Sequence, residues 1–316
     1  MSSLRSWPGK LRLPVAVTRS VVYRVTAWLI VLLAAGAALT LLPVKWIAMG
    51  LLAAVGVALT AIWPQTALYL IPFAVPFGSL VSANLGGISV GITEALLVLA
   101  LAAWLATKVA FRQPIAWPRL ALPTLLLTGT SALSLLHAES LPLAAKELAK
   151  WLEFLAVMVI VANIASHSDR QSRTLVACLL LAGIAQAGLG AYQFLTRSGP
   201  EFFAFGRFMR AYGTFEQPNP FGGYLGLGAP LALALALCSR KHAMPAWLKW
   251  LALGGFLVIG AGIAMSGSRG AWLGAAMALG LITVAHGRQG QLILMVILLL
   301  IALAGSVGGA AFVPDQ

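Results

Sequence analysis

Long uninterrupted apolar runs constrain this chain more than any other feature of its sequence. The hydrocarbon core of a bilayer requires about 20 apolar residues per spanning helix, and cutting the sequence at its proline, glycine and charge clusters leaves eleven such runs. Only 9% of the residues are charged, whereas soluble domains carry about a quarter. Water-soluble enzymes and intrinsic disorder are therefore excluded. We predict an all-α, polytopic integral membrane protein.

The predicted transmembrane helical domain occupies residues 24–312 and follows a basic cytoplasmic segment, residues 1–23. Its eleven spans are expected at residues 24–42, 45–63, 66–80, 90–110, 119–137, 146–166, 173–196, 219–238, 247–266, 270–286 and 291–312. The third run is short and contains Pro72 and Pro76. Because proline removes a backbone donor, this run is expected to be kinked or re-entrant.

The distribution of basic residues predicts the orientation of the spans. Cytoplasmic loops are enriched in Lys and Arg, and a cytoplasmic N-terminus places 14 of the 21 Lys and Arg residues on that side. The C-terminus then lies on the outer side. The net charge of +13 comes from short clusters between apolar runs and forms no continuous face, so membrane lipids are the predicted partners and nucleic acid is not.

Two segments on the predicted outer side break the apolar pattern, and the first runs from Arg210 to Leu225. It reads Arg-Ala-Tyr-Gly-Thr-Phe-Glu-Gln-Pro-Asn-Pro-Phe-Gly-Gly-Tyr-Leu. Asn219 is a favourable N-cap, and Pro220 suits the first position of a helix. The eighth span is therefore expected to begin here, with unpaired backbone N–H groups facing outward.

The second segment is Ser-Gly-Ser-Arg-Gly at residues 266–270. Ser268 is the expected N-cap of the tenth span, and this places Arg269 in or beside its first turn. A helix N-terminus carries partial positive charge and free N–H donors, and an arginine beside it adds a planar fork that fits phosphate oxygens. If the helices pack together, Arg210 and Arg269 share one phosphate or pyrophosphate group.

An interpretation of these arginines without a ligand has the same weight as the anion site. They either extend to the membrane interface or pair with Glu201 and Glu216, without binding a ligand. The outer loop 197–218 also interleaves aromatic residues with cations, which is typical of an interfacial segment. Such a segment either guides a lipid-linked anion or only anchors the loop, so Arg207 is a weaker candidate, as are Asn219 and Ser268.

The remaining charged residues suggest pairing and no metal site. Lys146, Glu147, Lys150 and Glu153 have spacings that allow salt bridges along a helix, and Glu94 lies about one turn inside the fourth span. We expect Glu94 to pair internally, although a transporter would use it as a proton or ion site. No histidine has metal-ligand spacing, and no nucleotide-binding or serine-hydrolase motif occurs. Neither a metal nor a cofactor is predicted.

At the two outer segments the sequence resembles the O-antigen ligase and polysaccharide polymerase superfamily of bacteria. The resemblance rests on two motifs, Arg-x-x-Gly-Thr-Phe-x-x-Pro-Asn at residues 210–219 and Ser-Gly-Ser-Arg-Gly-Ala-Trp-Leu-Gly at residues 266–274. The resemblance implies a GT-C-like, metal-independent, inverting glycosyltransferase at the periplasmic face of the inner membrane. Its donor is a glycan on undecaprenyl pyrophosphate. Its acceptor is a lipid A-core sugar, another lipid-linked glycan or a protein hydroxyl.

The resemblance also implies roles for particular residues. Arg210 and Arg269 match the arginines that bind the donor's pyrophosphate. The family's general base is a histidine on a large outer loop after this point, but residues 313–316 are only the start of such a loop, so that histidine is not present in this chain. His137 has no matching context. We therefore expect a C-terminally truncated enzyme, with two alternatives: an inactive remnant, or a secondary transporter of a small anion such as bicarbonate.

Overall fold

The computed structural model describes residues 26, 44–78, 82–85, 88–237, 244–285, 287, 291–292 and 295. Contacts divide the chain into two units, residues 1–58 and residues 59–316. The first unit contributes most of helix α2 (Val44–Ile62). The predicted basic segment 1–23, most of the first and eleventh spans and residues 313–316 lie outside the described residues.

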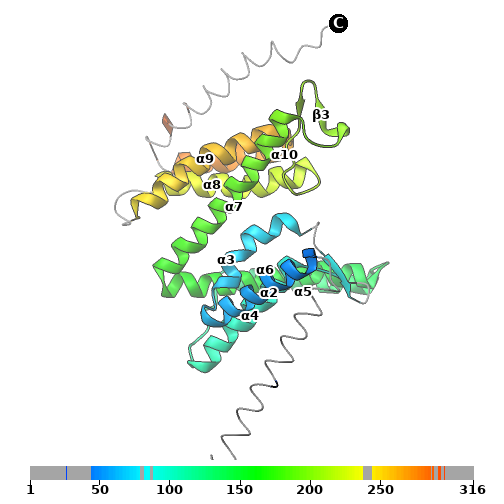
Figure 1. Ribbon diagram of the computed structural model, residues 1–316. Coiled ribbons are helices and arrows are strands. Elements are labelled where there is room, and N and C mark those ends of the chain that lie inside the picture. Colours follow the sequence, from blue (N-terminus) through cyan, green and yellow to red (C-terminus); the bar gives the residue numbers. More distant parts are fainter. Residues whose placement is uncertain are drawn as a thin grey trace, which may run out of the picture. The chain divides into compact units, whose positions relative to one another are not determined.

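Helices account for most of the described chain (Figure 1). After α2 they are α3 (Thr66–Ala74), α4 (Ile92–Ala110), α5 (Ala121–Leu133), α6 (Leu141–His167), α7 (Asp169–Thr196), α8 (Pro218–Leu237), α9 (Ala246–Ser266) and α10 (Arg269–Ala285). Within the described ranges, five of them are long and apolar enough to cross a membrane: α4, α6 over residues 141–165, α7, α8 and α9. The predicted class of helical membrane protein agrees with these helices, whereas the eleven spans and their orientation stay predictions.

Two helices begin four or five residues earlier than their apolar runs predict. Helix α6 begins at Leu141 instead of residue 146, because Pro142 at its start has a fixed φ that is already helical. The predicted Glu147–Lys150 ion pair (2.6 Å) forms within this helix. Helix α7 begins at Asp169 instead of residue 173, because Ser168 caps it by accepting a hydrogen bond from the Gln171 backbone N–H (3.3 Å). A proline near the start of α6 and a capping serine before α7 thus set helix starts that hydropathy does not show.

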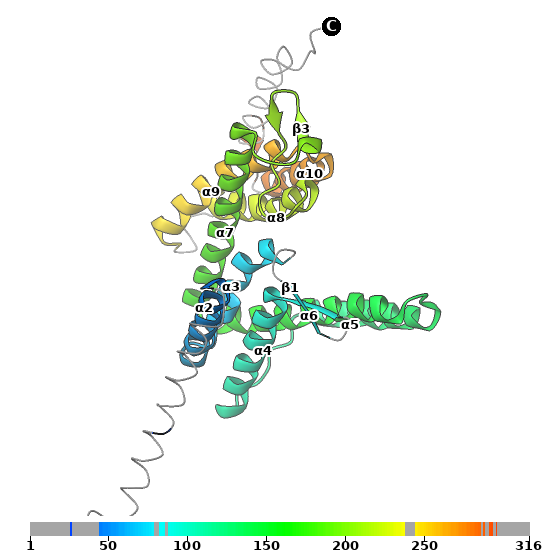
Figure 2. The same cartoon turned by 45° about the vertical axis from the view of Figure 1, so that its right-hand side comes forward.

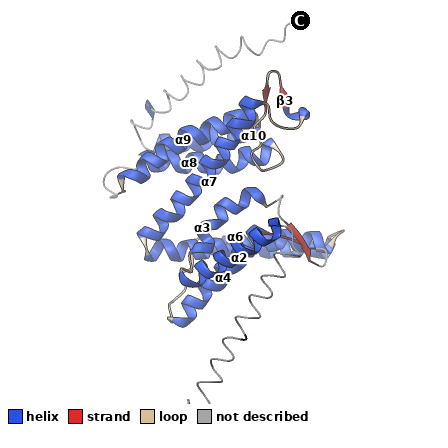
Figure 3. Ribbon diagram, viewed as in Figure 1, coloured by secondary structure: helices blue, strands red, loops and turns tan. Residues whose placement is uncertain are grey.

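Short non-helical elements connect the helices (Figure 3). Strands β1 (Ser82–Leu85) and β2 (Ile88–Gly91) form one antiparallel hairpin, and β3 (Ala204–Phe205) and β4 (Phe208–Met209) form another. Three 3-10 turns are η1 (Val75–Phe77), η2 (Ser134–His137) and η3 (Glu201–Phe203). The all-α prediction did not include the hairpins, since strands of two to four residues leave no periodic signal in a sequence.

The third predicted span is broken, as its prolines predict. Helix α3 ends at Ala74 and continues as the 3-10 turn η1, so the run contains no long continuous helix. Proline removes an N–H donor and its ring obstructs the preceding turn. The segment therefore supplies a short helix that packs against α4 and α7.

Two clusters of buried side chains hold the second unit together. The first joins α7, α8, α9 and α10 around buried residues such as Phe221, Leu225 and Ile259, and α8 and α9 lie side by side in both views (Figures 1 and 2). Small residues allow this approach, since a Cβ added to Gly262 would lie 2.7 Å from the Leu225 side chain. The second cluster joins α3, α4, α6 and the start of α7.

Candidate functional site

Two buried glutamines on α7 fix the loop that leads into α8. Gln193 donates from Nε2 to the Gly213 carbonyl (2.8 Å), and its Oε1 accepts from the backbone N–H groups of Tyr212 (3.2 Å) and Gly213 (2.7 Å). Gln186 accepts from the Thr214 backbone N–H (3.2 Å). Neither hydropathy nor a motif singles out these glutamines in the sequence. Their signal is two amides seven residues apart in an apolar run, which places both on one helix face.

The same loop brings Arg210 to the end of α9. The backbone N–H of Ala211 donates to the Met265 carbonyl (3.0 Å). The Arg210 guanidinium donates from Nε to the Ser266 carbonyl (3.0 Å) and from Nη2 to the Gly267 carbonyl (3.3 Å). These carbonyls belong to a helix C-terminus, which carries partial negative charge and leaves acceptors unpaired. Arg210 therefore caps the C-terminus of α9, and these hydrogen bonds fix the position of its side chain.

The turn between α9 and α10 leaves room for the Arg210 side chain. Gly267 has a left-handed φ of +61°, and a Cβ there would lie 2.9 Å from Nε of Arg210. Ser268 follows and accepts a hydrogen bond at Oγ from the Ala271 backbone N–H (3.4 Å). The predicted N-cap of the tenth span is thus confirmed. Gly222 of α8 fits against the turn, since its added Cβ would lie 2.9 Å from Ser266 Oγ.

Asn219 occupies a different position from the predicted one. Helix α8 begins at Pro218, so Asn219 lies inside the first turn and is not the N-cap. The physical reason is the fixed φ of Pro218, which is already helical and moves the start of the helix forward. The Asn219 side-chain oxygen instead accepts a hydrogen bond from Nη2 of Arg210 (3.4 Å).

Arg269 is exposed and begins α10. Salt bridges in the described part of the chain join Lys150 to Glu147 and Arg173 to Asp169. Neither Glu201 nor Glu216 pairs with Arg210 or Arg269 there, so the predicted alternative of carboxylate pairing is wrong for the described residues. A cation at a helix N-terminus opposes the helix dipole. Arg269 thus adds positive charge where the helix end is already positive.

These residues meet on the wall of one cavity of about 1570 Å³. Arg210, Asn219, Ser268 and Arg269 all line it, and most of the remaining wall is apolar or glycine: Phe194, Gly223, Gly226, Leu227, Ala264, Met265, Gly267, Gly270, Ala271, Trp272, Gly274, Ala275 and Ala278. The fifth candidate, Arg207, is not among the lining residues. It is exposed on the β3–β4 hairpin, with its guanidinium carbon 5.1 Å from the centre of the Phe208 ring.

Two other predicted residues lie away from this cavity. Glu94 accepts a hydrogen bond at Oε2 from the Gly91 backbone N–H (2.9 Å) and so completes the N-terminal cap of α4. Glu94 thus has a local backbone partner, whereas its use as a proton or ion site stays a prediction. His137 lies in the turn η2 after α5 and is not among the residues that line the cavity. Of the predicted site residues, the structure therefore gathers the four from the two motif segments.

Comparison with known proteins identifies no relative, because no protein-family model, curated protein or solved structure matches this chain. The functional conclusion depends on the residues themselves and on the geometry of the cavity that they form.

Proposed function

We propose that the cavity between α8, α9 and α10 binds the pyrophosphate of a lipid-linked glycan. The protein would transfer that glycan from undecaprenyl pyrophosphate to an acceptor at the periplasmic face of a bacterial inner membrane, as an O-antigen ligase-like enzyme. The observation that carries the proposal is the pair Arg210 and Arg269, which have no carboxylate partner among the described residues and line one largely apolar cavity.

The two arginines have complementary roles in this proposal. Arg210 uses Nε and Nη2 to bind protein carbonyls and Asn219, which leaves Nη1 for a ligand. Arg269 has its whole guanidinium for the ligand, and the first N–H groups of α10 lie beside it. A pyrophosphate presents many acceptor oxygens to such donors. The apolar wall suits the polyprenyl chain that accompanies this headgroup.

The proposed reaction is glycosyl transfer with inversion. The acceptor hydroxyl oxygen attacks the anomeric carbon and forms a new C–O bond, while the bond from that carbon to the pyrophosphate oxygen breaks. The leaving pyrophosphate gains negative charge, and Arg210 and Arg269 would stabilise that charge by charge-assisted hydrogen bonds. The acceptor's proton passes to a general base, which we assign to no residue of this chain.

Binding of a polyprenyl pyrophosphate tests the proposal directly. We expect Arg269→Gln to weaken binding to the detergent-purified protein by about tenfold or more, because it removes charge-assisted hydrogen bonds. Its melting temperature should not fall, since Arg269 bonds to no described residue and its charge opposes the α10 dipole. Arg210→Gln should weaken binding and also lower stability by about 1–3 kcal/mol. Lys249→Gln, an exposed cation on α9, is the matched control.

The outcomes separate transfer from its alternatives. Unchanged binding in Arg269→Gln would remove the pyrophosphate assignment. Binding that depends on Arg269 without glycan transfer in cells would indicate an inactive binding protein. An anion transporter would lose transport on substitution of Glu94 and would tolerate Arg269→Gln.

A further inference from the structure

A second cavity, of about 310 Å³, lies at the other end of α7 and plays no part in the proposed glycan transfer. It is bounded by the start of α3, the end of α4, the connection after α4, the end of α6 and the first turn of α7. From Gln171 at its wall to Phe194 at the first cavity, α7 rises about 35 Å. The predicted orientation places this second cavity on the cytoplasmic side.

A buried cation forms part of its wall. Lys108 is 7% exposed, and it is the charged residue among the lining residues. Its Nζ donates one hydrogen bond, to the Pro114 carbonyl (3.1 Å), and lies 6.0 Å from the centre of the Trp104 ring. No carboxylate in the described ranges pairs with it. An ammonium has three N–H donors, so two of them remain for a ligand. A buried charge is costly without a counter-ion, which favours an anion as that ligand.

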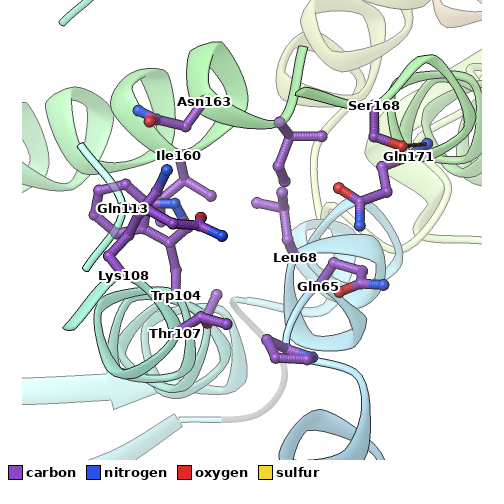
Figure 4. Close-up of a pocket in the computed structure, with 13 residues that line it drawn as sticks. Gln65, Leu68, Trp104, Thr107, Lys108, Gln113, Ile160, Asn163, Ser168 and Gln171 are labelled. Atoms are coloured by element: carbon purple, nitrogen blue, oxygen red, sulfur yellow. Dashed lines mark hydrogen bonds between the residues drawn. The ribbon is translucent and has the colours of Figure 1, made fainter. Parts of the chain in front are cut away.

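A second observation points to the same ligand. The indole Nε1 of Trp104 is buried and has no hydrogen-bond partner within the described chain. Buried polar atoms normally have partners, so this unpaired donor, in a residue that lines the cavity, favours an acceptor there. Figure 4 shows Trp104, Lys108 and Gln113 together on one side of the cavity, with Gln65 and Gln171 on the other side. The lining residues include no Asp or Glu.

We propose that this cavity binds a phosphate group, with Lys108 supplying the charge and Trp104 and the glutamine amides supplying donors. A phosphate has several acceptor oxygens, which suits one ammonium together with N–H donors on both sides of the cavity. The volume is at the small end of ligand sites, so it fits a small anion or a headgroup and not a whole lipid. The ligand is either free inorganic phosphate or the phosphate in the headgroup of an anionic phospholipid.

Thermal unfolding of the full chain in an uncharged detergent tests this site. We expect sodium phosphate to raise the melting temperature saturably, compared with sodium chloride at equal ionic strength. Lys108→Gln retains a donor for the Pro114 carbonyl and removes the charge, so it should weaken the apparent affinity by about tenfold or more. Trp104→Phe retains the ring and removes the N–H, and it should weaken the affinity too.

Two control variants and a comparison of phosphate sources identify the site and its ligand. Lys249→Gln should respond as the unsubstituted protein does. Arg269→Gln should also retain the response, which separates this site from the cavity between α8, α9 and α10 (the glycan cavity). Stabilisation by phosphatidylglycerol, but by neither free phosphate nor an uncharged diacyl glycolipid, would identify a lipid headgroup. An equal response in Lys108→Gln and Trp104→Phe, or no response to either phosphate source, would overturn the proposal.

Discussion

The phenol of Tyr224 donates a hydrogen bond to the carbonyl oxygen of Pro72 over 2.9 Å. Pro76 follows Pro72 by four residues and has no N–H, so the acceptor that a continuous helix would satisfy has no backbone donor. Tyr224 lies on α8 directly after Gly223, which lines the glycan cavity. The break in α3 is therefore stabilised by the helix that carries the candidate site.

Tyr224→Phe should destabilise the protein by about 1–3 kcal/mol, because the buried Pro72 carbonyl loses its partner while the ring is retained. Thermal unfolding in detergent measures this change. Tyr192→Phe is the control, since that ring is 58% exposed and its hydroxyl makes no hydrogen bond within the described chain. Equal melting temperatures for the two variants would show that the hydrogen bond contributes nothing.

Gly267→Ala should lower stability by about 1–2 kcal/mol, because a left-handed backbone disfavours a Cβ and this Cβ would meet Arg210 at 2.9 Å. Gly260→Ala on the same α9 should be neutral or stabilising, since its Cβ meets no atom within 4 Å and alanine favours helix. Unfolding of both variants is compared under one condition. A neutral Gly267→Ala would contradict the role assigned to this turn.

Gln193→Leu should cost about 2–5 kcal/mol, because it leaves two backbone N–H groups and one carbonyl unpaired in the loop before α8. Hydrogen exchange reports the effect directly, with faster exchange of the Tyr212 and Gly213 amides. Gln217→Leu, in the same loop but exposed, should leave those amides protected. Unchanged exchange in Gln193→Leu would show that other contacts hold the loop.

Gly226→Leu should block polyprenyl pyrophosphate binding while the protein stays folded, because Gly226 lines the cavity and has no neighbour within 4 Å of an added Cβ. Gly188→Leu on α7 meets equally open space but lies outside the cavity lining, so it should bind normally. Binding of the labelled lipid to both purified variants makes the comparison. Normal binding by Gly226→Leu would place the ligand elsewhere.

Local features of the sequence determined most helix positions. The predicted second to tenth spans each correspond to a helix or a broken helix, because apolar length, prolines and caps act within one segment. Ser268 was found in the same way, since a cap bonds to a residue three positions ahead. Helix starts were predicted less well, because they depend on the fixed dihedrals of Pro142 and Pro218 and on the cap of Ser168 instead of on hydropathy.

The tertiary structure decided which of the two arginines is committed to the protein. Arg210 binds carbonyls that lie 56 and 57 residues ahead in the chain, whereas Arg269 binds no described residue. The roles of Gln193 and Lys108 also emerged only there, since each depends on surroundings from several helices. A sequence shows the donors that a residue carries, but only the packed helices determine which donors are satisfied and which remain for a ligand.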